Sequence, residues 1–300
     1  MRPVLIAGPT ASGKSALALA IAERDGGLVI NADALQVYDC WRVLTSRPDD
    51  ADCARAPHRL YGHVAGDATY SVGAWLREIA PVITEVRTRG RRLVIVGGTG
   101  LYFHSLTNSL AHVPAIPLEV RARSDETLRA GRLDALIGDL VRDDPATLSR
   151  IDVANPRRVQ RAWEVLVATG RGLHDWRCSG TTAILAPENC VRLTVAKEIY
   201  YNNIDIKHRF EKMIEQGVID ECARFVAAGH DRDAPAGRAL GAAALIGHLE
   251  GRLALTDAVE AAVIATRRYA KRQRTWIRGH MADWTSVEPG VAALGRVPRD

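Results

Sequence analysis

The stretch GPTASGKS, from Gly8 to Ser15, has a spacing that binds phosphate groups. It follows the apolar run Val4–Ala7 and precedes the helical run Ala16–Glu23, so a strand, a glycine-rich loop and a helix stand in the required order. Backbone N–H groups and the helix N-terminus would face phosphate oxygens, Lys14 adds a charge, and the Ser15 hydroxyl can reach Mg²⁺. The alternative is a glycine-rich turn with a chance lysine. We expect a di- or triphosphate held by Gly8, Pro9, Thr10, Ala11, Ser12, Gly13, Lys14 and Ser15.

Two further polar residues follow other predicted strands. Asp33 comes after Leu28–Ile30, and Thr99 comes after Leu93–Val96, where a nucleotide hydrolase usually has an acid that orders Mg²⁺. The position of Asp33 at the carboxyl end of a strand favours a general base, with a helix cap or a metal-orienting acid as the alternative. Thr99 is either a donor to a phosphate or bridging oxygen or a turn residue that caps the next helix.

Basic residues gather in two segments. Residues 266–280, TRRYAKRQRTWIRGH, contain six Lys or Arg and no acid, and on a helix residues 267, 271, 274 and 278 share a face. A face with one sign of charge, with Tyr269 and Trp276 among the cations, favours nucleic acid over a solvated face or an acidic protein partner. NPRRVQRAW forms a second cluster with Arg157, Arg158 and Arg161, so we expect a groove for nucleic acid between the two patches.

A sheet and an inserted helical segment must position these residues. The apolar runs at 4–7, 28–30 and 93–96 are continuous, which indicates parallel strands buried on both faces, and we expect a further core strand at 191–195. Helical patterns separate the runs, so we predict an α/β fold with a P-loop NTPase-like parallel sheet flanked by helices. Only helical periodicity appears from about 114 to 176. We therefore expect a core domain of residues 1–112 and 178–300, with helices from 204 to 280, and an all-helical insertion lobe at 113–177.

The composition is that of a globular protein. Three hundred residues with 47% apolar content are sufficient for a buried core. No apolar run approaches the roughly 20 residues that span a bilayer, and the N-terminal strand leaves no room for a signal peptide. We therefore expect a cytoplasmic protein without a membrane partner. The five cysteines lack the spacing of a disulfide framework or a zinc site.

Taken together, these residues resemble the family of tRNA dimethylallyltransferases, or tRNA isopentenyltransferases. The matching motifs extend along the chain: GPTASGKS, the DALQVY stretch, VGGTGLYF, NPRRVQRAWEVLVATG, RFEKMIEQG, RALG and ATRRYAKRQRTWIR. The resemblance implies transfer of a dimethylallyl group from dimethylallyl diphosphate to N6 of adenosine 37, next to the tRNA anticodon, with release of pyrophosphate. It also explains the missing hydrolase acid, because the loop would hold a leaving group.

The resemblance also implies roles for individual residues. Thr10, Lys14, Ser15 and Arg209 would bind the diphosphate, with Mg²⁺ as cofactor. Asp33 would be the base on the adenine amine, Thr99 would contact the oxygen that bridges carbon and diphosphate, and Arg121 matches an arginine important in the family. A monomer is expected to bind the tRNA anticodon stem-loop through Asp33, Ala34, Leu35, Gln36, Arg157, Arg158, Arg161, Arg238, Gly241, Lys271, Arg272, Gln273, Arg274, Trp276 and Arg278.

The chain also departs from the family pattern. LTSRP at 44–48 stands where the family has GTAKP, and Asn203 stands where it has an arginine. Ala242 and Ala243 replace a tyrosine-containing pair. These departures affect substrate preference more than reaction type. Three other functions fit part of the pattern. A small-molecule kinase would leave both basic clusters unexplained, and an RNA-binding regulator would leave Asp33 and Thr99 unexplained. An adenylate isopentenyltransferase would need no lobe for an anticodon stem.

Overall fold

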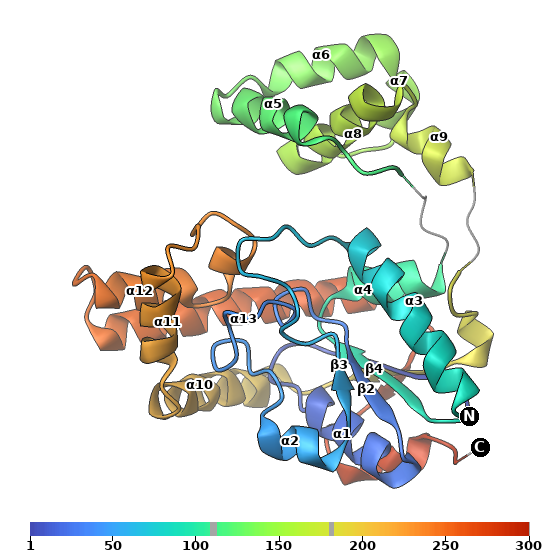
Figure 1. The fold of residues 1–300 in the computed structure, drawn as a ribbon, viewed down its shortest axis with the longest axis vertical. Helices are drawn as coiled ribbons and strands as arrows, with labels where there is room; N and C mark the ends of the chain where they lie inside the picture. The colour runs from blue at the N-terminus through green and yellow to red at the C-terminus, as the bar shows by residue number, and fades with distance from the viewer. Residues whose placement is uncertain (109–112, 180–182, 300) are drawn as a thin grey trace. The chain divides into compact units, whose positions relative to one another are not determined.

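The chain folds into two compact units (Figure 1). The computed structural model describes residues 1–108, 113–179 and 183–299. Unit 1 consists of residues 1–107 and 185–300, and unit 2 consists of residues 108–184. The lobe borders predicted from the sequence, 113 and 177, lie a few residues inside the bounds of unit 2. As the borders of a functional domain they stay a prediction.

A parallel sheet forms the centre of unit 1. Within the described residues it has six strands in the order β3-β2-β4-β1-β5-β6, and every neighbouring pair is parallel. The strands are β1 Val4–Ala7, β2 Leu28–Asn31, β3 His58–Arg59, β4 Leu93–Gly97, β5 Val191–Val195 and β6 Thr285–Val287. The predicted α/β class and its four predicted strands are confirmed. The short outer strands β3 and β6 were not predicted.

The central strands are buried on both faces. Val4, Ile6 and Val94 belong to one apolar cluster with Leu17 and Ile21 of α1, which spans Lys14–Asp25. Because side chains alternate along a strand, the residues between them project to the opposite face, where α3 (Val72–Thr88) and α4 (Gly100–Thr107) pack. A sheet covered by helices on both sides explains why the strand segments are apolar throughout.

The C-terminal helices form a second apolar core in unit 1. These helices are α10 Ile199–Glu215, α11 Val218–Ala227, α12 Ala242–Leu249 and α13 Leu255–His280. The remaining helix of unit 1 with a label in Figure 1 is the short α2, Asp50–Arg55, between β2 and β3. Figure 1 shows α10, α11 and α12 grouped around the long α13. The segment that follows β2 joins this core, because Trp41 stacks on Phe225 at 4.5 Å and its indole N–H donates to the Ala236 carbonyl over 2.9 Å. The segment after β2 and the helices after β5 therefore share one apolar core.

Unit 2 is helical in its described part and has a core of its own. Its helices are α5 Leu118–Arg129, α6 Leu133–Asp143, α7 Pro145–Leu148, α8 Pro156–Thr169 and α9 Leu173–Cys178. Leu136, Leu140 and Trp163 are buried together at its centre. The chain leaves unit 1 and returns to it at adjacent positions, since the Leu185 N–H donates to the Leu106 carbonyl over 3.1 Å. No helix in the described residues is both long and apolar enough to cross a bilayer.

The approach of β4 to β2 supplies a stability prediction. A Cβ atom on Gly97 would lie 2.0 Å from the Ala32 carbonyl oxygen, whereas a Cβ on Gly138 of α6 would meet nothing within 4 Å. Gly97→Ala should therefore lower the free energy of unfolding by about 1–3 kcal/mol. Gly138→Ala, the matched control in a helix, should raise it by about 0.5–1 kcal/mol. Denaturant titration of both variants checks this, and equal stability of the two would contradict it.

Candidate active site

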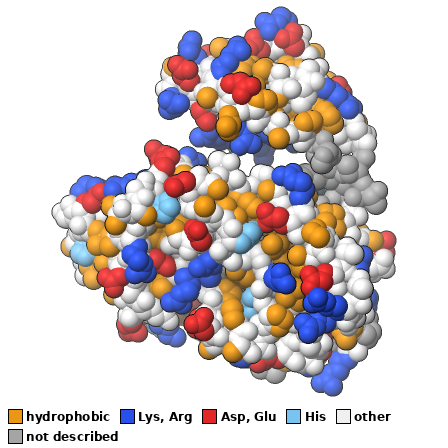
Figure 2. Space-filling view, in the orientation of Figure 1, with side chains coloured by type: hydrophobic (Ala, Val, Ile, Leu, Met, Phe, Trp, Pro, Cys, Tyr) orange, Lys and Arg blue, Asp and Glu red, His pale blue; other side chains and the backbone are white. Residues whose placement is uncertain are grey.

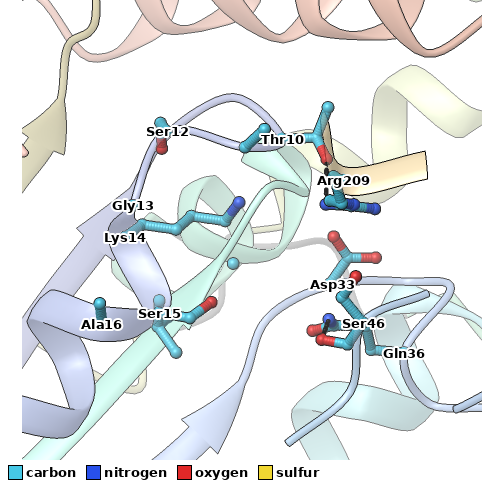
Figure 3. Close-up of a pocket in the computed structure, with 13 residues that line it drawn as sticks. Thr10, Ser12, Gly13, Lys14, Ser15, Ala16, Asp33, Gln36, Ser46 and Arg209 are labelled. Atoms are coloured by element: carbon cyan, nitrogen blue, oxygen red, sulfur yellow. Dashed lines mark hydrogen bonds between the residues drawn. The ribbon is translucent and has the colours of Figure 1, made fainter. Parts of the chain in front are cut away.

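The phosphate-binding loop connects β1 to α1. Gly13 caps α1 with a φ of +82°, a conformation that favours glycine, and Ala11 has a φ of +59°. The Lys14 ammonium donates a hydrogen bond to the Pro9 carbonyl over 3.1 Å, so this side chain folds back across its own loop (Figure 3). The first N–H groups of a helix have no partner within it, and those of α1 directly follow the loop, where such groups bind anions. This arrangement attracts an anion.

Helices α10 and α13 hold the loop in place at Thr10. The Thr10 N–H donates to Gln273 Oε1 over 2.8 Å, and the Thr10 carbonyl accepts from Asn202 Nδ2 over 3.0 Å. The Thr10 hydroxyl accepts from Arg209 Nη1 over 2.8 Å. The other end of the Gln273 amide donates to the Gly98 carbonyl over 2.9 Å, so this side chain links the loop to the end of β4. Thr10, Asn202 and Gln273 are all buried.

Asp33 is fixed by the residue at the end of β2. The buried Asn31 side chain accepts from the Asp33 N–H and donates to the Asp33 carbonyl, each over 2.9 Å, and it also donates to the Leu60 carbonyl. Asp33 Oδ1 accepts from the Leu35 N–H over 2.9 Å. Figure 3 shows the Asp33 carboxylate directed toward the Arg209 guanidinium across the opening of the loop. Asn31 is a site residue that the sequence analysis missed.

Thr99 joins the ends of β2 and β4. Its hydroxyl accepts from the Ala34 N–H over 3.0 Å. Its carbonyl accepts from the Tyr102 N–H over 3.0 Å at the start of α4. The hydroxyl therefore bonds a neighbouring segment and does not cap its own helix. Thr99 is not among the described residues that line the cavity at the loop.

A cavity of about 120 Å³ lies between the loop and Asp33. It is lined by Thr10, Ala11, Ser12, Gly13, Lys14, Ser15, Ala16, Asp33, Gln36, Ser46, Val96, Gly97 and Arg209. A second cavity of about 220 Å³ adjoins it and shares the lining residues Ser15, Ala16, Gln36, Ser46 and Val96. In Figure 3, Asp33, Gln36 and Ser46 lie on the side opposite Lys14 and Ser15. We call these three residues the acceptor wall.

The charges in the cavity are arranged for an anion. Burial lowers the pKa of Lys14 from 10.5 to about 8, the nearby Asp33 carboxylate raises it, and Arg209 lowers it further. Burial also lowers the pKa of Arg209, and Asp33 opposes that change. Two cations thus share one small space with a single carboxylate. Burial makes this excess of positive charge unfavourable. A multiply charged anion bound between the two cations would neutralise it.

The basic residues of α13 fall into two groups. Lys271, Arg272 and Arg278 are exposed, whereas Arg274 is half-buried and donates to Asn202 Oδ1 over 3.0 Å. Arg274 is therefore bonded to the residue that holds the Thr10 carbonyl. Both ends of the Gln273 amide are already hydrogen bonded, one to the Thr10 N–H and the other to the Gly98 carbonyl. A tRNA contact by Gln273 would have to replace these bonds.

The remaining predicted contact residues differ in exposure. The Trp276 indole packs where a side chain on Gly100 would be, with Cδ1 2.0 Å from that Cβ position, and stacks on His280 at 4.0 Å. Ala34, Leu35 and Gln36 are half-buried beside Asp33, Arg238 is exposed, and Gly241 is buried. Gly241 has a φ of +91°, and a Cβ there would meet Ala262 at 3.0 Å, so its role within the fold is close packing.

The other arginines predicted at the site belong to unit 2. Arg157 and Arg158 are exposed on α8, and Arg157 is paired with Asp125 at 3.1 Å. Arg161 is half-buried, and burial lowers its pKa, with Arg121 of α5 adding to the decrease. Figure 2 shows Lys and Arg side chains on the drawn surface of both units. Arg121 is not among the described residues that line the cavity of unit 1.

The residues at the loop fit a phosphate-bound metal ion better than a metal held by protein alone. Within the described residues, no cluster of three or more His, Cys, Asp or Glu side chains could hold a metal. Mg²⁺ at phosphate sites needs only one or two protein ligands, because phosphate oxygens and water complete its octahedron. The Ser15 hydroxyl is exposed and lines the cavity, so it is suited to that position.

A parallel sheet, a loop of this form at the end of β1 and cations around a phosphate-sized cavity define a P-loop protein. Comparisons with known proteins narrow this class. The family described as IPP transferase matches residues 36–280, and the isopentenyl transferase family matches residues 1–63. The chain is 54% identical to the tRNA dimethylallyltransferase of Dinoroseobacter shibae, covering 97% of this chain and 96% of that one. It is 51% identical to the one of Paracoccus denitrificans, over 96% and 95%. The chain therefore belongs to the tRNA dimethylallyltransferase family.

Solved structures agree with this assignment. The tRNA isopentenylpyrophosphate transferase of Bacillus halodurans is 30% identical, with a TM-score of 0.67 over 96% of this chain and 90% of that one. A eukaryotic dimethylallyltransferase acting on tRNA has a TM-score of 0.82 at 23% identity, over 97% of this chain and 74% of that one, and it supports the fold. The resemblance inferred from the sequence motifs is confirmed.

The lowered pKa of Lys14 predicts a pH dependence. Only the ammonium form attracts a diphosphate, and with a pKa of about 8 its fraction falls as pH rises through that value. Affinity for dimethylallyl diphosphate should decrease about tenfold between pH 7 and pH 9. Lys14→Arg should keep its affinity over this range, because a guanidinium stays protonated. Calorimetric titration at several pH values measures the affinity of both proteins. Any ionisation of the ligand affects both proteins equally, so parallel pH profiles would contradict the assignment of the pH dependence to Lys14.

Proposed function

We propose that this protein transfers a dimethylallyl group from dimethylallyl diphosphate to N6 of adenosine 37 in tRNA, with release of pyrophosphate. The observation that carries the proposal is the small cavity in which Lys14 and Arg209 face Asp33 across the phosphate loop. A site of this kind neutralises a diphosphate leaving group on one side and offers a base on the other. The sequences and names of the relatives described above support the same reaction.

The diphosphate side of the cavity is built from the loop residues Gly8–Ser15 and Arg209. An allylic diphosphate ionises readily because its cation is delocalised, so the protein needs mainly to stabilise the departing charge. In this proposal Lys14 and Arg209 move from their bonds with Pro9 and Thr10 to the phosphate oxygens. Mg²⁺, held at the Ser15 hydroxyl, would supply additional neutralising charge when bound.

The amine side is the acceptor wall. Asp33 Oδ1 is occupied by the Leu35 N–H, which orients the carboxylate and leaves Oδ2 for the substrate. As adenine N6 forms its bond to the allylic carbon, the carbon–oxygen bond to the diphosphate breaks and the N6 proton passes to Asp33. Thr99, held beside Ala34, is proposed to contact the bridging oxygen once the substrates are bound.

The exposed basic residues are proposed to bind the anticodon stem-loop. An adenine stacked in the loop cannot reach a cavity of this size, so it must leave the stack, and backbone contacts offset the cost of a few kcal/mol. Lys271, Arg272 and Arg278 of α13 supply such contacts, as do Arg157 and Arg158 of α8. We further propose that residues 113–177 form the lobe that holds the stem, that Arg121 serves the reaction from this lobe, and that the protein acts as a monomer.

The test is an incubation with radiolabelled dimethylallyl diphosphate and unmodified tRNA, and separately with labelled ATP. We expect transfer of label from the first compound to adenosine 37 with stoichiometric pyrophosphate. A small-molecule kinase would instead consume ATP and leave the tRNA unlabelled. Label on free adenylate but not on tRNA would identify a nucleotide prenyltransferase.

Asp33→Asn separates a base from a metal-orienting acid. The amide keeps the shape but accepts no proton, so single-turnover transfer should fall roughly 10²–10⁴-fold, with binding of tRNA and diphosphate within about threefold of the parent. If Asp33 ordered Mg²⁺ instead, diphosphate binding would weaken and added Mg²⁺ would restore part of the rate. A rate within about tenfold of the parent at every Mg²⁺ concentration would refute both roles.

The two groups of cations on α13 should respond differently to substitution. Lys271 is exposed, so Lys271→Ala should weaken tRNA binding, lower its salt slope by about one unit and leave donor binding unchanged. Arg274→Ala should weaken both, because Arg274 bonds to Asn202, which holds the loop at Thr10. Filter binding for tRNA and calorimetry for the donor distinguish the cases. Unchanged donor binding in Arg274→Ala would show that this bond does not support the loop.

A further inference from the structure

Glu221 of α11 is a buried carboxylate that the site described above does not use. Its side chain is 5% exposed. One oxygen accepts from the Arg42 N–H over 2.6 Å and the Val43 N–H over 3.0 Å, and the other accepts from the Leu44 N–H over 2.8 Å. Three consecutive backbone N–H groups thus converge on one carboxylate. A buried anion is stable only when such donors satisfy it, so this contact is a specific one.

The three N–H groups open a tight turn. Within it the Ser46 N–H donates to the Val43 carbonyl over 3.0 Å and the Arg47 N–H donates to the Arg42 carbonyl over 3.0 Å. The first N–H groups of such a turn lack partners inside it, as at the start of a helix. Glu221 supplies those partners from 177 to 179 residues away in the chain. It therefore acts as a cap provided by a separate helix.

The far end of this turn belongs to the acceptor wall. Ser46 has a φ of +52°, a conformation unusual for a residue other than glycine, so surrounding bonds must hold it. Gln36 Nε2 donates to the Thr45 and Ser46 carbonyls, each over 2.9 Å. Gln36 and Ser46 line the 120 Å³ cavity, whereas Glu221 is not among the described residues that line it. The turn therefore connects Glu221 to the cavity through a short hydrogen-bonded segment.

We propose that Glu221 is a positioning residue that fixes the acceptor wall through the 42–46 turn and Gln36. The proposal rests on the proposed function, since it assigns this wall to the adenine side of the reaction. The phosphate loop is held separately, by Gln273 and Asn202 at Thr10. Loss of the Glu221 contact should therefore impair use of the tRNA acceptor without changing the binding of the diphosphate donor.

The first measurement needs no activity. Amide hydrogen exchange of residues 42–44 should be slow in the parent and faster in Glu221→Gln, in which an NH₂ group replaces one acceptor oxygen. Amides of α12 report on the overall fold and should exchange as in the parent. Unchanged protection at 42–44 in Glu221→Gln would overturn the capping role. Because Gln keeps the volume of Glu, this variant serves even if Glu221→Ala does not fold.

The second measurement links the cap to catalysis through a double-mutant cycle. With anticodon stem-loop RNA and dimethylallyl diphosphate, Glu221→Ala should lower kcat/KM for the RNA by roughly 10²-fold, as for a displacement of about 1 Å, and Glu221→Gln by less. Donor affinity should stay within about twofold of the parent for both variants, because the loop is held by other residues. Gln36→Ala should have a large effect in the parent and a small one in Glu221→Ala.

Val218→Ala is the control for loss of stability, because Val218 is fully buried in the same helix and its apolar side chain cannot make the hydrogen bonds that Glu221 makes to the turn. It should lower thermal stability with little change in kcat/KM. Additive effects of Glu221→Ala and Gln36→Ala would overturn the proposal, as would an equal loss of kcat/KM in Val218→Ala. If the parent transfers nothing to RNA, the proposed function fails, and the exchange measurement still decides whether Glu221 caps the turn.

Discussion

The phosphate loop depends on hydrogen bonds from helices far along the chain. Thr10 uses its N–H, its carbonyl and its hydroxyl to bind Gln273, Asn202 and Arg209, which are 263, 192 and 199 residues away. Leaving a buried backbone group without its partner costs about 1–3 kcal/mol, so α10 and α13 are strongly constrained in position relative to the loop. The same helices carry Arg209 and the exposed cations of α13. One set of bonds therefore sets the distance between the cavity at the phosphate loop and the exposed cations of α13.

The electrostatics of the cavity follow from this arrangement. Burial and the neighbouring Arg209 lower the pKa of Lys14, burial lowers the pKa of Arg209, and Asp33 opposes both changes only in part. The protein therefore holds charges that are most stable when an anion lies between them. Asp33 is in turn kept in place by Asn31 and by the Leu35 N–H, so it need not swing into position when substrate arrives. Preorganisation of this kind lowers the reorganisation that the reaction itself requires.

The sequence predicted the central strands, the phosphate loop and the helical character of residues 113–177, because continuous apolar runs and the loop spacing are local signals. It did not predict β3 and β6, which have two and three residues and lie at the sheet edges, where little apolar sequence is needed. The roles of Asn31, Asn202 and Glu221 could not be predicted either. Asn202 and Glu221 each bind a partner in another element, which only the tertiary fold brings near. Asn31 bonds the local Asp33, but its bond to the Leu60 carbonyl likewise depends on the fold. For Gln273 the sequence indicated a place on the basic helix, but its burial against the loop was visible only in three dimensions.

The adjacent exit and return of the chain at Leu106 and Leu185 bears on the order in which the protein is made. All residues of unit 2 have been synthesised by position 184, and this unit has its own apolar core. At that stage Asn202, Arg209 and Gln273 have not yet left the ribosome, so the N-terminal loop lacks every side chain that holds it at Thr10. A growing chain folds in units, beginning at its N-terminus. Here unit 2 can fold completely before α13, which unit 1 needs, has been synthesised. The cavity at the phosphate loop therefore cannot take its final shape until most of the chain, as far as Gln273, has been made.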